Sequence, residues 1–128
     1  MTNNGLHRQA VAEAERFFPS SVRQWHRMGL VVDGRVVYVR VARPSPSRHP
    51  RPNGKTYEYR LWRWNLHGHT ERPATPWRWL LIGIDGRRRR YWLVPGRAML
   101  GHGKTIVTGC DRKHPYAGLL NRYAVTPP

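Results

Sequence analysis

The chain has 128 residues, enough for one domain that buries roughly two-thirds of its surface on folding. Lys and Arg number 23 against 7 Asp and Glu, a formal net charge of +16, so we expect a polyanionic partner. Hydrophobic residues make up 39% and aromatic residues 11%, which excludes a disordered basic tail and predicts a single domain over residues 1–128.

Two helices are predicted at the start of the chain. Residues 7–18 carry apolar side chains at helical spacing, and Pro19 ends that helix. Residues 20–29 predict a second, short helix that begins at a serine cap, carries Trp25 on its apolar side and is closed by Gly29.

A β-hairpin and an exposed loop are expected next. Residues 29–43 form two β-branched runs around Asp33-Gly34, a dipeptide typical of a two-residue hairpin turn. Residues 44–55 contain four prolines and no apolar anchor, which predicts an exposed basic loop.

The second half of the chain predicts further strands. Residues 57–64 alternate in polarity, and residues 77–84, which include the apolar run 79–84, are typical of a buried central strand. Arg87–Arg90 are expected at a turn that leads into a strand ended by Pro95.

Residues 105–110 add a last strand, and Pro115 begins a closing helix that carries Tyr116, Leu119, Leu120 and Tyr123. This order predicts an α/β or α+β domain. Its central sheet is mixed, mostly antiparallel and of about five strands, flanked by the N- and C-terminal helices.

The order of elements resembles the small PD-(D/E)XK nucleases of the restriction-endonuclease-like superfamily, and within it the intron-associated homing endonucleases. The resemblance spans residues 8–100 and rests on a glutamate-bearing helix, the DG hairpin, a strand ending VRVAR, and the segments KTYEYRLWRWNLHGH, WLLIGID and YWLVP. It implies the restriction-endonuclease-like fold and a homodimer on a two-fold DNA target.

In that family an Asp on the first hairpin strand and a Glu-x-Lys on the second hold Mg²⁺ and orient the attacking water. The corresponding positions here are Gly29, Tyr38 and Arg40, and none of them matches. Because Mg²⁺ needs oxygen ligands, which Gly and Arg side chains do not offer, we expect a degenerate site without a cofactor.

A relocated metal site would need other carboxylates. Asp33 and Asp85 each precede a glycine in a predicted turn, where Asp bonds to its local backbone. Glu13 or Glu15 on the first helix, together with Glu58 on a strand, remain as candidates for an active Mg²⁺-dependent endonuclease. Ion pairing with nearby arginines is the commoner fate of such acids.

Two shorter motifs give no site. His67-Gly68-His69 could share one face of a strand, but no third ligand at metal-site spacing is evident, so no metal is expected there. The segment 101–105, GHGKT, looks like the end of a phosphate-binding loop but lacks the earlier glycine and precedes a strand-like run.

Cationic and aromatic residues suggest how a polyanion could bind. The run Arg87–Arg90 predicts a phosphate clamp, a groove-entering hairpin or a solvated turn, and the loop 44–55 an arm that orders on nucleic acid or a plain linker. Trp62 and Trp64 share a strand face with Arg60, so they either fill the core or stack on unpaired bases. The predicted nucleic-acid-binding residues are Arg40, Arg43, Arg48, Arg51, Lys55, Arg60, Arg63, Arg87, Arg88, Arg89 and Arg90.

The leading expectation is a nucleic-acid-binding protein descended from a nuclease, without hydrolytic activity, in which Arg40 supplies a cation to a former catalytic cleft. DNA is the first expected partner and structured RNA the second. The alternatives are the Mg²⁺-dependent endonuclease and a non-catalytic structural or ribosome-associated RNA binder. A lone cysteine, Cys110, and the lack of a signal peptide or a run of ~20 apolar residues predict a cytoplasmic protein without a membrane partner.

Overall fold

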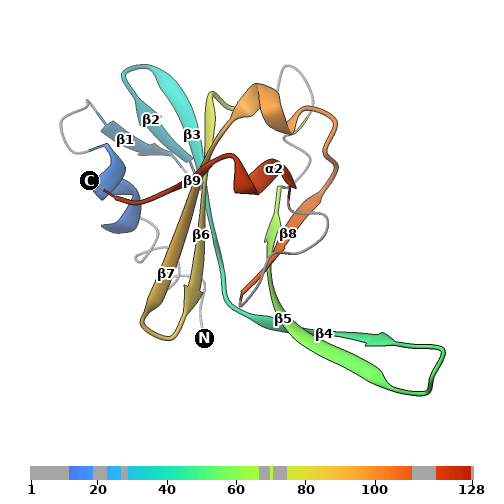
Figure 1. Ribbon diagram of the computed structural model, residues 1–128. Coiled ribbons are helices and arrows are strands. Elements are labelled where there is room, and N and C mark those ends of the chain that lie inside the picture. Colours follow the sequence, from blue (N-terminus) through green and yellow to red (C-terminus); the bar gives the residue numbers. More distant parts are fainter. Residues whose placement is uncertain are drawn as a thin grey trace.

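A computed structural model describes residues 12–18, 23–26, 29–66, 70, 75–110 and 118–127. Within them the chain forms two sheets (Figure 1). The six-stranded sheet has the order β1-β2-β3-β6-β7-β9 and the three-stranded sheet the order β4-β5-β8. The strands are β1 Arg23–His26, β2 Gly29–Val32, β3 Arg35–Ala42, β4 Ser45–Pro50, β5 Thr56–Asn65, β6 Arg78–Asp85, β7 Arg88–Pro95, β8 Thr105–Gly109 and β9 Ala124–Val125.

The central sheet is mixed and mostly antiparallel, as predicted, because β3 and β6 run parallel and the other neighbouring strands run antiparallel. It has one strand more than expected, and the second sheet was not foreseen. Helical structure is limited to residues 12–17, the 3₁₀ turn η1 Gly96–Met99 and α2 Gly118–Asn121 in the described residues. None of these helices is long and apolar enough to cross a membrane.

The predicted hairpin is confirmed. Strands β2 and β3 pair with Val32 opposite Arg35, which leaves Asp33 and Gly34 as a two-residue turn. Their φ angles of 51° and 80° are the left-handed values that such a turn requires, and Asp and Gly adopt them more readily than other residues. The sequence therefore fixes the register of this pair locally.

Strand β6 lies in the middle of the domain, as its apolar run predicts. Leu80 and Ile82 pack into one core with Ala14 of the first helix, while Trp79 and Leu81 pack into a second core on the other face. Side chains of a strand alternate between faces, so a strand covered on both sides reads as continuously hydrophobic.

The three-stranded sheet covers the second core with tryptophans. The indole nitrogens of Trp62 and Trp64 donate to the carbonyl oxygens of Ile84 (3.2 Å) and Ile82 (3.0 Å) across the interface. A Cβ atom on Gly83 would lie 2.6 to 2.9 Å from the Trp62 ring, so only glycine lets the two sheets approach this closely.

Two predicted elements are wrong. Residues 23–26 are strand β1, paired with β2, and not a helix. The prediction failed because the free edge of β2 offers backbone partners that override a weak local helix signal. Val22 and Met28 of the predicted helix lie outside the described residues.

Residues 45–50 are also a strand and not a loop. Pro46 and Pro50 are four residues apart, so their missing N–H groups lie on the same side of β4. Because β4 is an edge strand, that side needs no hydrogen-bonding partner.

Two boundaries differ from the prediction. Strand β7 begins at Arg88, so of the four adjacent arginines only Arg87 lies on the turn. The closing helix α2 ends at Asn121, which leaves Tyr123 outside it, while residues 115–117 lie outside the described part. The predicted helix over residues 7–18 is confirmed for residues 12–17, and residues 7–11 are not described.

Candidate nucleic-acid interface

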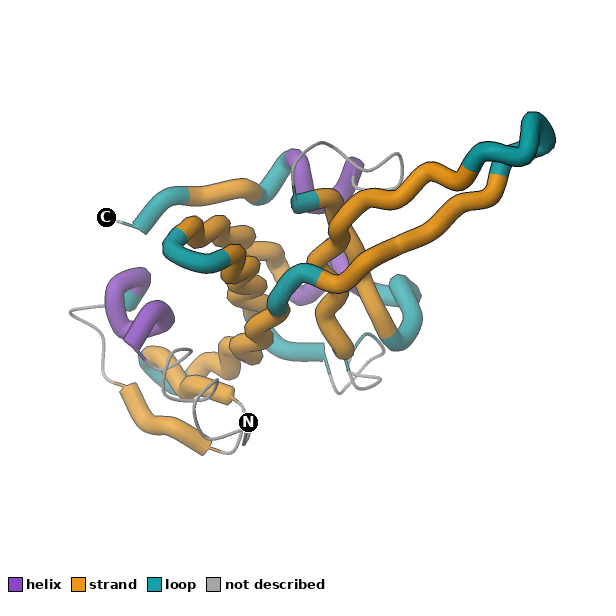
Figure 2. Tube along the Cα trace, turned by 90° about the horizontal axis from the view of Figure 1, so that it is seen from below, coloured by secondary structure: helices purple, strands orange, loops and turns teal. Residues whose placement is uncertain are grey.

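A two-stranded arm projects from the body of the protein. The arm comprises residues 45–60, that is β4, the turn after it and the outer half of β5, and it carries the three-stranded sheet out beyond the rest of the protein (Figures 1 and 2). The side chains of Arg48, Arg51 and Lys55 are exposed on it. Arg48 Nε forms an ion pair at 3.3 Å with Oε2 of Glu58, which is the one acidic residue of the arm.

At the base of the arm, one carboxylate holds two arginines. Arg60 Nη1 and Nη2 each lie 3.0 Å from an oxygen of Asp85, and Arg88 Nη2 lies 3.0 Å from Asp85 Oδ2. Arg88 Nη2 also donates to the carbonyl oxygen of Cys110 at 2.7 Å. These contacts join the end of β6 and the start of β7 to β5, so the β6–β7 turn and the arm lie on one side of the protein.

The other arginines of the predicted clamp have separate roles. Arg87 is exposed on the turn, whereas Arg89 bonds Glu13 Oε1 at 3.3 Å and the Gly86 carbonyl oxygen at 2.7 Å. The guanidinium of Arg90 lies 5.2 Å from the ring centre of Trp92. Successive residues of a strand face opposite ways, so the run does not act as one cluster.

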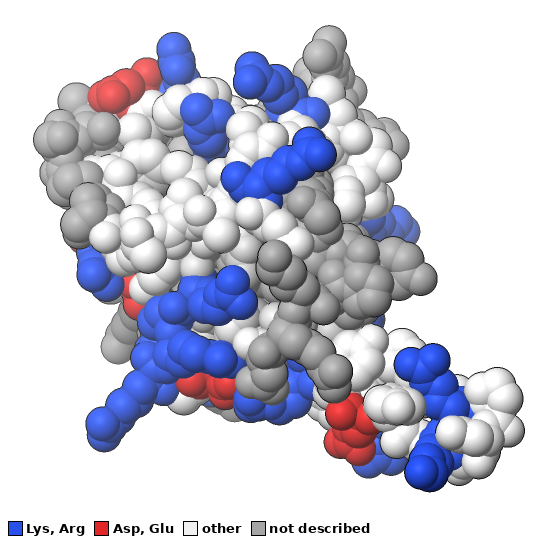
Figure 3. Space-filling model, in the orientation of Figure 1, with Lys and Arg blue, Asp and Glu red and all other residues white. Residues whose placement is uncertain are grey.

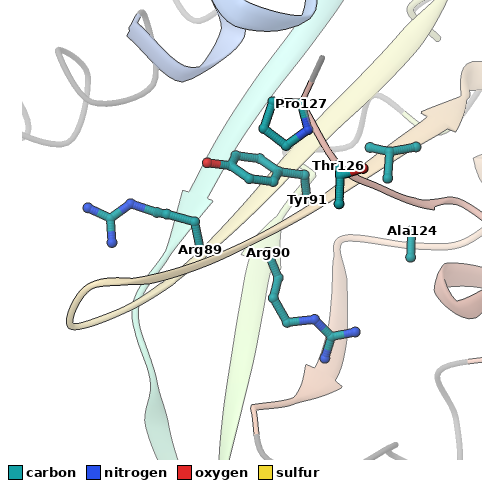
Figure 4. Close-up of a pocket in the computed structure, with 7 residues that line it drawn as sticks. Arg89, Arg90, Tyr91, Ala124, Thr126 and Pro127 are labelled. Atoms are coloured by element: carbon teal, nitrogen blue, oxygen red, sulfur yellow. The ribbon is translucent and has the colours of Figure 1, made fainter.

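A cavity of about 650 Å³ is lined by Arg89–Tyr91 of β7 and by residues 124–127 of the C-terminal segment, which pairs with β7 through β9. Arg89 and the Tyr91 hydroxyl point toward the same side there, and Arg90 points the other way (Figure 4). Tyr91 donates its hydroxyl hydrogen to Glu13 Oε2. Burial, and secondly this hydrogen bond, raise the pKa of Tyr91 to about 12, so the phenol remains a donor at neutral pH.

Glu13 and Glu58 do not form a metal pair. Glu13 contacts Arg16, Arg89 and Tyr91 and fastens the first helix to β7. Glu58 lies on the arm, and both views place the arm and that helix on opposite sides of the protein (Figures 1 and 2). Glu15 is exposed on the same helix as Glu13.

No group of three or more His, Cys, Asp or Glu side chains is placed to hold a metal ion within the described ranges. His67 and His69 lie outside those ranges. The segment 101–105 leads directly into strand β8, and no helix follows it to face a phosphate.

Arg40, expected to contact phosphate, is buried with 6% of its surface exposed. Its guanidinium lies 5.3 Å from the ring centres of both Tyr38 and Trp79. It donates to the carbonyl oxygens of Asn65 (3.1 Å) and Val39 (3.0 Å). Burial lowers the pKa of Arg40. The side chain therefore links the two sheets and is withdrawn from the surface that a polyanion could reach.

Of the other two positions of the degenerate motif, Tyr38 lies beside Arg40 and Gly29 lies beside Tyr38. Gly29 and Tyr38 are paired opposite each other on β2 and β3. Gly29 is buried and Tyr38 half-buried.

Trp62 and Trp64, considered for base stacking, are buried with 0% and 1% exposure and belong to the core. Sequence reasoning instead missed the aromatic residues of the arm, of which His49 and Tyr57 are exposed and Tyr59 is half-buried. The signal was present as the alternation Tyr57-Glu58-Tyr59, which places two rings on one strand face. Residues 57–64 were predicted to form a strand, but residues 44–55 were predicted to form a loop, so no partner strand was expected to extend this face.

Comparisons with protein-family models, curated proteins and solved structures find no match to this chain.

Proposed function

We propose that this protein binds nucleic acid, with DNA as the first partner, and that it does not hydrolyse its ligand. The contact region is a basic surface, defined here as Arg48, Arg51, Lys55, Arg60, Arg87 and Arg88. All six side chains are exposed, and Asp85 and Glu58 are the acids that pair with them.

The observation that carries this proposal is the bridge through Asp85. It places Arg88, beside the β6–β7 turn, next to Arg60, at the base of the arm. Figure 3 shows Lys and Arg side chains along the lower edge of this face and on the arm, with few acidic groups among them. Such a surface attracts phosphates, and counterion release then favours binding. A projecting two-stranded ribbon is also a shape that the major groove of DNA accommodates.

Descent from a PD-(D/E)XK nuclease is part of the proposal. It is supported by the DG hairpin, the mixed central sheet, and a buried Arg40 at the position of the family's lysine. Under this proposal the motif positions now stabilise the fold and no longer hold a metal. The restriction-endonuclease-like arrangement and a homodimer on a two-fold target belong to the same proposal.

An electrophoretic shift series with duplex DNA, single strands and structured RNA tests the function at about 150 mM salt, near physiological ionic strength. We expect a duplex shift whose log affinity falls with log salt by about 0.9 per phosphate contact. Arg87→Ala should weaken binding, and Arg97→Ala is the control, since Arg97 is exposed on η1 outside the basic surface. Absence of binding to every polynucleotide would overturn the proposal.

A plasmid-cleavage assay in Mg²⁺ or Mn²⁺ tests the proposal that the protein does not hydrolyse its ligand. We expect no cleavage. Cleavage that is lost in Glu58→Ala would instead establish the metal-dependent endonuclease. A shift with structured RNA and none with DNA would favour the RNA-binding alternative.

A further inference from the structure

The two faces of the arm differ in chemistry. Residues paired opposite each other in antiparallel strands point to the same face. Arg48 opposite Glu58 and Pro46 opposite Arg60 therefore form one face, which is mostly charged. His49 opposite Tyr57 and Ser47 opposite Tyr59 form the other, which is aromatic.

The aromatic face is held in a defined geometry. The rings of His49 and Tyr59 stack with their centres 5.0 Å apart and their planes 7° from parallel. The hydroxyl groups of Ser47 and Tyr59 lie 2.8 Å and 2.9 Å from His49 Nε2, within hydrogen-bond distance. These contacts restrain the rings before any ligand arrives, which lowers the entropy cost of binding.

Tyr57 is the exposed ring of this face. Half of its surface is accessible, although it lies on a strand where an aromatic residue usually packs against a core. The guanidinium of Arg51 lies over one side of this ring, 4.7 Å from the ring centre, so a cation is in contact with the exposed ring. An aromatic ring next to a cation suits a nucleotide, whose base stacks while its phosphate meets the positive charge.

The spacing of the rings favours unpaired bases over a duplex. Tyr57 and Tyr59 are two residues apart on one strand, which separates their Cα atoms by about 6.6 Å. Stacked bases in a duplex are about 3.4 Å apart. Successive bases can meet both rings only after they separate from one another, which a single strand does at low cost.

We propose that the aromatic face of the arm, centred on Tyr57, binds unpaired bases of a single-stranded segment. This inference rests on the proposed nucleic-acid binding and names its substrate class. The basic surface holds phosphates of any polynucleotide, and the aromatic face adds affinity where the bases are unstacked.

The test compares a blunt duplex with the same duplex that carries a single-stranded overhang, as DNA and as RNA of one sequence. We expect the overhang to tighten binding by wild-type protein. Tyr57→Ala should reduce that gain by roughly 5- to 140-fold, the range of aromatic stacking on one base, and leave blunt-duplex affinity unchanged. Tyr57→Phe should keep the gain, and Tyr57→Leu should lose it, because the proposed stacking requires an aromatic ring and not apolar bulk.

Val36→Ala is the matched control, because Val36 is also an exposed hydrophobic residue but lies on β3 outside the arm. Near-ultraviolet circular dichroism of the buried tryptophans verifies that each variant is folded. No gain from the overhang, or a gain that Tyr57→Ala retains, overturns this inference while duplex binding still supports the proposed function. If wild-type protein binds neither ligand, the proposed function itself fails.

Discussion

Asp85 holds Arg60 through both of its carboxylate oxygens: Arg60 Nη1 donates to Oδ1 and Arg60 Nη2 forms an ion pair with Oδ2, each at 3.0 Å. The two residues are 25 positions apart, one at the end of β6 and the other on β5. Because Arg88 bonds the same carboxylate, a single acid holds two cations at the base of the arm. This acid both organises the basic surface and subtracts from its charge.

Asp85→Asn should therefore tighten nucleic-acid binding, because it removes the negative charge beside two phosphate-binding arginines. The cost in unfolding free energy should stay below about 1 kcal/mol, since both arginines are half exposed. Shift assays and urea unfolding measure the two effects. Asp33→Asn is the control, because it changes the net charge equally at the β2–β3 turn, where Asn also tolerates the left-handed φ. If both variants bind nucleic acid more tightly by the same factor, the net charge of the protein and not the position of Asp85 explains the effect.

Arg87→Ala and Arg89→Ala should behave differently although the residues are neighbours in one run. Arg87 is exposed, so its loss should flatten the salt dependence by about one unit and change stability by less than about 0.5 kcal/mol. Arg89 bonds Glu13 and a backbone carbonyl, so its loss should destabilise the fold by about 1–3 kcal/mol. Salt-dependent shift assays and urea unfolding separate the two. The same salt dependence and the same stability in both variants would contradict the separate roles assigned to Arg87 and Arg89.

Gly83→Ala should destabilise the protein by about 1–3 kcal/mol, since the added methyl group collides with the Trp62 ring. Urea unfolding followed by tryptophan fluorescence measures the loss. Trp62→Leu in the Gly83→Ala background is the control: it should cost less than in the wild type, because the smaller side chain relieves the collision. Additive costs would show that the two residues are not coupled.

Tyr91 should make stability depend on alkaline pH. Its pKa is raised from 10.0 to about 12 in the folded state, so the protonated phenol favours the fold. This stability is fully present below pH 10, falls as pH rises from 10, and is lost above 12. Tyr91→Phe should be less stable than wild type at neutral pH, and the difference should narrow over that window. The measurement is the free energy of unfolding of both proteins at each pH from 8 to 12. A difference between the two proteins that stays constant over this range would exclude the linkage.

The sequence by itself determined the features that depend on neighbouring residues. Asp33-Gly34 encodes its turn because those two residues tolerate positive φ, and the apolar run of β6 encodes a strand buried on both faces. The sequence also determined the excess of positive charge, which needs no fold to be counted.

Tertiary structure decided which cations and rings face the solvent. Arg89 is bound by Glu13, 76 positions away, and Arg40 is covered by Trp79. Trp62 entered the core, whereas Tyr57, on the same strand, remained exposed because the arm extends beyond the body. Burial and pairing arise from groups that meet only on folding, so local sequence patterns do not contain them.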